Sequence, residues 1–168
     1  MVNSLLKRNP KIHPQLDFPD YKSSILRAPK NKKISFSSTT TEISGPVFNK
    51  NKIGKLDNDL TLNFSKNNTL PVGHKIIVFG TISDQFSNPI DGALIEIWQA
   101  NSAGKYLHHN DKNIAPIDPN FAGCGRSITS SKGYYEFVTI QPGPYPYPNR
   151  GIEWRPMHIH FSVFGKSF

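Results

Sequence analysis

The sequence predicts an all-β protein whose core is an antiparallel β-sandwich, with long loops beside it and an extended N-terminal arm. Short runs of β-branched and aromatic residues recur in the second half of the chain, separated by clusters of Gly, Pro, Asn and Ser. No amphipathic helical pattern lies between these runs, so a parallel sheet built from βαβ units is not expected. Strands joined directly by turns are typical of an antiparallel sandwich.

The composition divides the chain into two parts. Residues 1–70 are rich in Lys, Asn and Ser, contain four prolines between positions 10 and 29, and carry 12 Lys and Arg against 5 Asp and Glu. We expect residues 1–70 to form a basic arm that is extended or lies across a partner subunit. Residues 71–168 hold the strand signals, and 168 residues are enough for one hydrophobic core, so we expect this second part to form the sandwich.

The strands expected in the core follow one another between residues 75 and 164. They are Lys75–Ser83, Ala93–Trp98, Tyr134–Ile140 and Met157–Phe164, with turns at Ser87–Pro89, Asp91–Gly92 and Ser130–Gly133. The first and third runs are dense in β-branched and aromatic residues. The second alternates apolar and polar residues near its end, as a strand with one buried face does.

Two segments are too long and irregular for a minimal sandwich. Residues 99–127 form a loop of nearly thirty residues that contains Tyr106, and residues 141–156 carry five prolines together with Tyr145 and Tyr147. Long connections without secondary structure of their own are usually functional or disordered. Because both segments flank the last predicted strand, we expect them to form the walls of a site.

The last predicted strand contains His158 and His160, two positions apart. Successive side chains of a strand alternate between its faces, so both imidazoles should lie on the same face. Neutral imidazole is the commonest protein ligand for metals, and the pair could form half of a metal site. Two histidines on a solvent-facing or core-facing strand explain the pattern equally well, and His-x-His alone leaves both interpretations open.

The long loops offer tyrosines rather than carboxylates to complete such a site. Glu153 precedes the histidines by only a few residues but is followed by Trp-Arg, and Asp118 is distant in the chain. A phenol has a pKa of about 10 in water, so only a strongly Lewis-acidic ion holds it as phenolate at neutral pH. Two tyrosines with two histidines therefore predict iron(III) rather than zinc or iron(II). Arg155, beside a cation, indicates that an anionic oxygen compound binds there too.

Composition argues against several other classes of function. The net charge is +8, but no helix-turn-helix or RNA-binding signature accompanies it, so we expect no nucleic-acid partner. No apolar stretch approaches the roughly 18 residues of a membrane span, and the first residues lack a secretory signal, so we expect no membrane association and a cytoplasmic location. The only cysteine, Cys124, excludes an intramolecular disulfide and is expected to be a small buried residue rather than a nucleophile.

A set of motifs spread over most of the chain carries a family resemblance. The motifs are Pro19–Lys22, Gly45–Phe48, Leu94–Tyr106, Pro116–Arg126, Gly133–Tyr135, Pro142–Pro148 and Trp154–Phe161. As a set they resemble the intradiol ring-cleavage dioxygenases, most closely the iron-bearing β subunits of the protocatechuate 3,4-dioxygenases. The resemblance is specific because the motifs are many and occur in the same order.

The resemblance implies a metal centre and a substrate pocket. The non-haem iron(III) would be bound by Tyr106, Tyr145, His158 and His160. Tyr145 would also act as an internal base, and Arg155 would lie beside the bound catechol. Tyr21 of the N-terminal arm and Tyr147 would line the pocket together with Arg155, although Tyr147 stands where close relatives carry tryptophan.

The activity implied by the resemblance is cleavage of protocatechuate by dioxygen to 3-carboxy-cis,cis-muconate, a step of aromatic catabolism in the β-ketoadipate pathway. The implied partner is a homologous α subunit in a hetero-oligomer, which the basic arm could reach. A catechol or hydroxyquinol 1,2-dioxygenase homologue is the alternative within the family. A non-catalytic, transthyretin-like β-sandwich module is the alternative from another class, because the strand pattern of residues 75–140 alone would support it.

Family members continue beyond the position of Phe168 with further sandwich strands. We therefore expect the sandwich of residues 71–168 to be incomplete at its C-terminus, with an open sheet edge beside the histidine strand. On this expectation an inactive fragment is a further alternative.

Overall fold

The computed structural model describes residues 18–20, 28–31, 53–67, 69–148 and 152–165. These residues form seven strands and no helix, which confirms the all-β prediction. The strands are β1 (Lys75–Thr81), β2 (Leu94–Trp98), β3 (Cys124–Ile128), β4 (Tyr134–Ile140), β5 (Tyr145–Pro148), β6 (Ile152–Arg155) and β7 (His160–Phe164). None of the described residues belongs to a helix that could cross a membrane.

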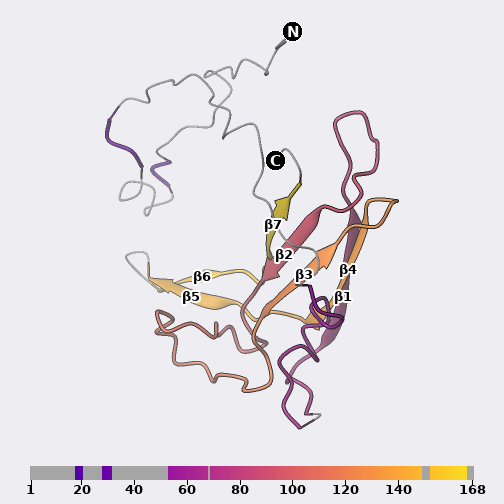
Figure 1. The fold of residues 1–168 in the computed structure, drawn as a ribbon. Coiled ribbons are helices and arrows are strands. Elements are labelled where there is room, and N and C mark those ends of the chain that lie inside the picture. Colours follow the sequence, from indigo (N-terminus) through magenta and orange to yellow (C-terminus); the bar gives the residue numbers. More distant parts are fainter. Residues whose placement is uncertain (1–17, 21–27, 32–52, 68, 149–151, 166–168) are drawn as a thin grey trace. The chain divides into compact units, whose positions relative to one another are not determined.

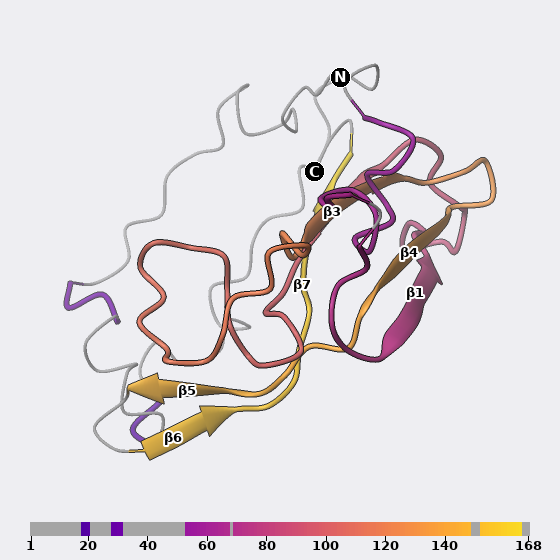
Figure 2. The same cartoon turned by 90° about the horizontal axis from the view of Figure 1, so that it is seen from below.

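The strands form two small sheets and a separate hairpin (Figures 1 and 2). β1 pairs with β4, while β2 lies between β3 and β7 in a three-stranded sheet, and all of these pairs are antiparallel. β5 and β6 pair with each other outside both sheets. The three-stranded sheet therefore holds the second half of the His-x-His motif, and the hairpin holds the Pro-Tyr-Pro-Tyr motif.

One hydrophobic core joins the two sheets. Ile95 and Ile97 of β2 and Phe137 of β4 are almost fully buried and belong to the same apolar cluster. Val78 of β1 and Val163 of β7 pack against this cluster from their own strands. Because alternate residues of facing strands fill one interior, the two sheets form a sandwich, as predicted.

A segment before the first strand also enters the core. Leu60 is completely buried in the cluster, and its N–H donates to the carbonyl of Val138 at 2.8 Å. Asp57 forms an ion pair with Arg126 of β3 at 2.7 Å. Residues 53–67, on the arm side of the predicted boundary at residue 70, therefore pack against the sandwich, and the division of the chain at that residue stays a prediction.

Strand boundaries differ from the prediction where pairing is non-local. β3 begins inside the predicted loop 99–127 and ends one residue beyond it, and it exists because its residues pair along β2, with Cys124 opposite Trp98. Cys124 is exposed there, so the prediction that it is buried was wrong. β5 and β6 lie inside the predicted insert 141–156, where a two-stranded hairpin tolerates prolines that a central strand would not.

Candidate active site

The structure brings together the side chains of Tyr106, Tyr145, His158 and His160. They come from four places: the loop after β2, the first residue of β5, the link between β6 and β7, and the first residue of β7. The Tyr106 and Tyr145 ring centroids lie 5.4 Å apart, edge to face. The Tyr145 and His158 centroids are also 5.4 Å apart, and those of the two histidines 4.8 Å. Two phenols and two imidazoles thus converge on one region.

His158 is oriented by a hydrogen bond outside the cluster. Its Nδ1 donates to the carbonyl of Pro156 at 2.6 Å, which assigns the proton to Nδ1 and leaves the lone pair on Nε2. That Nε2 lies 3.4 Å from the Tyr145 hydroxyl oxygen. The expected strand over Met157–Phe164 begins only at His160, so the prediction that His158 lies on a strand was wrong. The two rings are nevertheless in contact, edge to face.

Tyr106 carries a buried polar atom without a partner. Its hydroxyl oxygen makes no hydrogen bond to any residue that the structure describes. Burial raises the pKa of the phenol, and the nearby Tyr145 hydroxyl raises it further, whereas Arg155 opposes this. An unpartnered buried oxygen costs free energy, so its position beside Tyr145 needs an explanation. A cation among these four side chains would supply the missing partner.

The surroundings of His160 favour its neutral form. Burial lowers the pKa of its imidazole, and the neighbouring His158 and Arg155 lower it further. A neutral imidazole keeps a lone pair for a metal. The same arginine lowers the pKa of both Tyr106 and His160, so its positive charge acts on these two side chains of the cluster.

The two loops that carry the tyrosines meet at glycines. Gly104, two residues before Tyr106, has a left-handed backbone (φ 78°), and a Cβ there would overlap the carbonyl of Pro144, beside Tyr145. The N–H of Gly143 donates to the carbonyl of Asn101 at 2.9 Å. At position 104, only glycine permits the backbone to come this close to the Pro144 carbonyl. Gly104 therefore determines how close the two phenols come.

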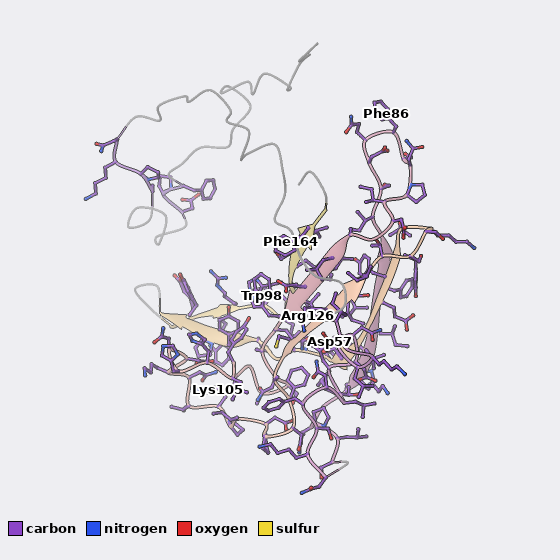
Figure 3. The ribbon with its side chains drawn as sticks, in the orientation of Figure 1. Asp57, Phe86, Trp98, Lys105, Arg126 and Phe164 are labelled. Carbon is purple, nitrogen blue, oxygen red and sulfur yellow. The ribbon has the colours of Figure 1, made fainter. Side chains whose placement is uncertain are left out.

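Asp111 holds the backbone around Tyr106 in place. Its two carboxylate oxygens accept the N–H groups of Tyr106 at 2.8 Å and of Asn113 at 2.7 Å, and the Lys105 ammonium lies 3.5 Å away. Burial raises the pKa of the carboxyl, but these N–H donors and the ammonium outweigh it and keep the pKa below its ordinary value. Figure 3 shows Lys105 in this loop. An Asn-Asp-Lys-Asn run is a turn signal, yet it did not indicate a contact with Tyr106.

We expect Asp111→Asn to destabilise the protein by about 1–2 kcal/mol, because the amide has one acceptor oxygen for two backbone N–H donors. Urea unfolding measures this change. Asp91→Asn provides the matched control, since Asp91 is exposed and its carboxylate accepts no hydrogen bond within the described part of the chain. Equal stability of both variants would contradict the role given to Asp111.

The remaining predicted site residues divide into two groups. The Arg155 guanidinium lies over the Tyr147 ring at 4.4 Å, so these two predicted pocket residues are in contact. Tyr21 lies outside the described residues.

Within the residues that the structure describes, no group of three His, Cys, Asp or Glu side chains could hold a metal ion. A metal centre with three or more protein ligands in this part of the chain would therefore need a ligand of another residue type.

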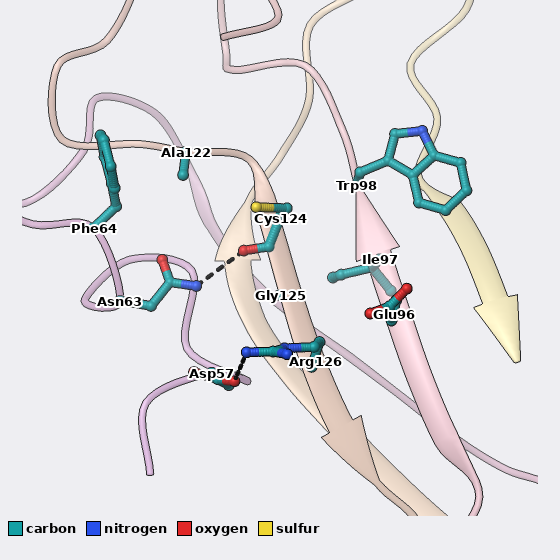
Figure 4. A pocket seen from close by; sticks show the side chains of 10 residues that line it. All are labelled: Asp57, Asn63, Phe64, Glu96, Ile97, Trp98, Ala122, Cys124, Gly125 and Arg126. Atoms are coloured by element: carbon teal, nitrogen blue, oxygen red, sulfur yellow. Dashed lines mark hydrogen bonds and ion pairs between the residues drawn. The ribbon is translucent and has the colours of Figure 1, made fainter. Parts of the chain in front are cut away.

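A separate cavity of about 430 Å³ opens on the outer face of β2 and β3 (Figure 4). Asp57 and Arg126 pair across it, and the Asn63 amide donates to the Cys124 carbonyl at 2.9 Å. None of the four converging side chains lines this cavity; Trp98, at its edge, is the residue that links it to His160. The cavity is therefore not the candidate active site.

Comparison with known proteins shows to which family the chain belongs. A family model described as "Dioxygenase" matches residues 43–168, and one described as "Protocatechuate 3,4-dioxygenase beta subunit N terminal" matches residues 6–39. The protocatechuate 3,4-dioxygenase beta chain of Burkholderia cepacia is 45% identical over 156 residues, which are 93% of this chain and 66% of that protein. This chain belongs to the intradiol ring-cleavage dioxygenase family. The family is known to use non-haem iron.

More distant family members match a smaller part of the chain. The catechol 1,2-dioxygenase of Candida albicans is 34% identical over 56% of this chain and 33% of its own length. The crystal structure of 3-chlorocatechol 1,2-dioxygenase from Rhodococcus opacus 1CP superimposes with a TM-score of 0.51 at 25% identity, over 71% of this chain and 50% of that one. This chain thus spans two thirds or less of the length of the relatives it matches.

Proposed function

We propose that this chain is the iron-bearing β subunit of a protocatechuate 3,4-dioxygenase, which cleaves protocatechuate with dioxygen to 3-carboxy-cis,cis-muconate. The observation that carries the proposal is the convergence of two phenols and two imidazoles, with the Tyr106 oxygen buried and without a hydrogen-bond partner among the described residues. Protocatechuate is favoured over catechol because the beta-chain relative matches 93% of the chain, whereas the catechol 1,2-dioxygenase of Candida albicans matches 56%.

The four converging residues fit a ferric ion. Tyr106 and Tyr145 would bind it as phenolates, and His158 through Nε2, the nitrogen that its hydrogen bond from Nδ1 to Pro156 leaves unprotonated. His160 would bind as the neutral imidazole that its surroundings favour. When bound, iron(III) supplies a strong Lewis acid that stabilises phenolates and a catecholate at neutral pH.

Tyr145 and Arg155 would perform the acid–base and electrostatic parts of the reaction. The Tyr145 oxygen lies 3.4 Å from His158 Nε2, and a phenolate at this position could accept a proton from a catechol hydroxyl. The Arg155 guanidinium would stabilise negative charge that develops on the substrate ring and its oxygens. Tyr147 packs its ring against that guanidinium and so fixes its position.

The proposed partner is a homologous α subunit in a hetero-oligomer. The excess of Lys and Arg over Asp and Glu in residues 1–70 gives this chain a basic segment for contact with an acidic surface of such a partner. Tyr21 belongs to the same segment, and we propose that it contributes to the substrate pocket.

Coexpression of the chain with an α-like subunit tests the proposal. We expect a red, iron-containing complex, because tyrosinate-to-iron(III) charge transfer absorbs visible light, and oxygen uptake about 10-fold or more faster with protocatechuate than with catechol. A colourless preparation without iron would favour a non-catalytic β-sandwich module. Faster turnover of catechol would indicate a catechol 1,2-dioxygenase homologue.

A further inference from the structure

Trp98 lies flat against one of the converging histidines. The indole of Trp98 and the imidazole of His160 are stacked, with centroids 4.8 Å apart and an interplanar angle of only 3°. Trp98 is the last residue of β2 and lies directly opposite His160, the first residue of β7. Figure 4 shows the indole extending from the end of β2 over the neighbouring strand. Directly opposed side chains on one sheet face are close enough for such contact.

The two histidines differ in what orients them. His158 has its hydrogen bond from Nδ1 to the Pro156 carbonyl. No hydrogen bond from the residues that the structure describes reaches the ring of His160, and its ring contacts are with Trp98 and His158. Metal-binding histidines almost always have a second group that determines the orientation of the ring. For His160, the stacked ring of Trp98 is placed where it can determine the orientation of the imidazole.

Core packing does not account for an aromatic residue at this position. Trp98 is 41% exposed and lies outside the hydrophobic cluster, whereas its neighbour Ile97 is 1% exposed and inside it. Trp98 is also held on both sides, because β2 pairs with β3 at Cys124 and with β7 at His160. A flat ring on a central strand is thus presented rigidly to the face of the His160 imidazole, and a face-to-face stack does not use the lone pair in the plane of that ring.

We infer that Trp98 is a positioning residue that fixes the ring plane of His160 and so prepares it to bind the metal, an inference that rests on the proposed function. The stack restricts rotation of the imidazole about its Cβ–Cγ bond before any ion arrives. Without the stack, the ring would lose rotational freedom only on binding, and the affinity for iron would fall accordingly. The protein backbone would be unaffected.

Three variants separate positioning from simple packing. Trp98→Leu keeps an apolar side chain but removes the flat surface, and Trp98→Phe restores a smaller flat surface. Phe79→Leu is the matched control, because Phe79 is an aromatic residue of β1 that is 66% exposed and contacts Tyr134 rather than the cluster. Each variant of the 168-residue chain is compared with the wild type for iron(III) affinity, using ferric citrate, and for the tyrosinate charge-transfer band. The imidazole NMR signals of His160 and the melting temperature are measured on the metal-free chain.

We expect Trp98→Leu to lower the iron(III) affinity by about 10–100-fold, the range for groups that orient metal ligands. The same variant should move the His160 ring-proton signals away from their ring-current-shifted positions and change the melting temperature by less than about 4 °C. Trp98→Phe should recover most of the affinity, and Phe79→Leu should match the wild type. Wild-type affinity in Trp98→Leu would overturn the inference, as would a loss that Phe fails to reverse.

The proposed function and this inference fail in different ways. A wild-type chain that binds no iron(III) overturns the proposed function. In that case the NMR signals of the metal-free chain still test the role of Trp98. Unchanged His160 signals in Trp98→Leu overturn the positioning role, and displaced signals support it.

Discussion

Replacing Tyr106 with phenylalanine is expected to stabilise the metal-free protein while removing its capacity for ring cleavage. The Tyr106 hydroxyl is buried without a hydrogen-bond partner among the described residues, and such a group costs about 1–3 kcal/mol. A phenyl ring would fill the same space without that cost, so the free energy of unfolding should rise by about 1 kcal/mol in urea titrations. The iron-loaded form would lose one of its four proposed protein ligands.

In the iron-loaded protein, Tyr106→Phe should be unfavourable. Its effect on iron affinity and oxygen uptake should be far larger than the gain in stability of the metal-free protein. Groups that merely orient ligands are worth about 10–100-fold, so loss of a ligand should lower iron affinity and oxygen uptake by more than about 100-fold. The visible charge-transfer band should weaken or shift. Tyr134→Phe is the control, because the Tyr134 hydroxyl is on the surface and donates a hydrogen bond to Glu136 at 2.6 Å. An unchanged spectrum in Tyr106→Phe would refute the assignment of Tyr106 as a ligand.

Gly104→Ala is expected to damage both folding and the site. The left-handed backbone costs a residue with a Cβ roughly 1–2 kcal/mol. Overlap of the new Cβ with the Pro144 carbonyl adds roughly 1–3 kcal/mol. We expect a total loss of stability of about 3 kcal/mol in urea titrations. Because the Pro144 carbonyl lies next to Tyr145, relief of the overlap would separate the two tyrosine loops and lower iron binding as well.

Gly54→Ala controls for the change of residue type. Gly54 does not have a left-handed backbone, and its new Cβ would meet the flexible Asp57 carboxylate at 3.0 Å. We expect a change in stability below about 1 kcal/mol in that variant. Equal losses in both variants would show that the contact of Gly104 with Pro144 does not hold the loops together.

The sequence predicted the elements that depend on local pattern. β4 coincides with its prediction, and β1 and β2 agree to within two residues, because runs of β-branched and aromatic residues mark them directly. β3 escaped prediction because Cys-Gly-Arg-Ser-Ile has little strand preference and becomes a strand only by pairing with β2. The exposure of Cys124 follows from the same pairing, since register decides which face a residue occupies.

The sequence likewise predicted some features of the candidate site and missed others. Tyr106, Tyr145, His158 and His160 were named from motifs, and Tyr106 and Tyr145, 39 positions apart in the chain, converge in the structure. His158 and His160 were expected side by side for a strand geometry that only His160 has. The contact of Asp111 with the Tyr106 backbone had no signal in the sequence beyond an ordinary turn pattern.

By itself, the sequence determined the fold class, the family and the chemical identity of the four converging side chains, since these depend on residue types and their spacing. Only the tertiary structure decided that Gly104 lets the two phenols meet and that Trp98 lies flat on His160. The reason is physical: close backbone approach and strand register are properties of pairs of segments far apart in the chain. Neither can be read from the local pattern of either segment.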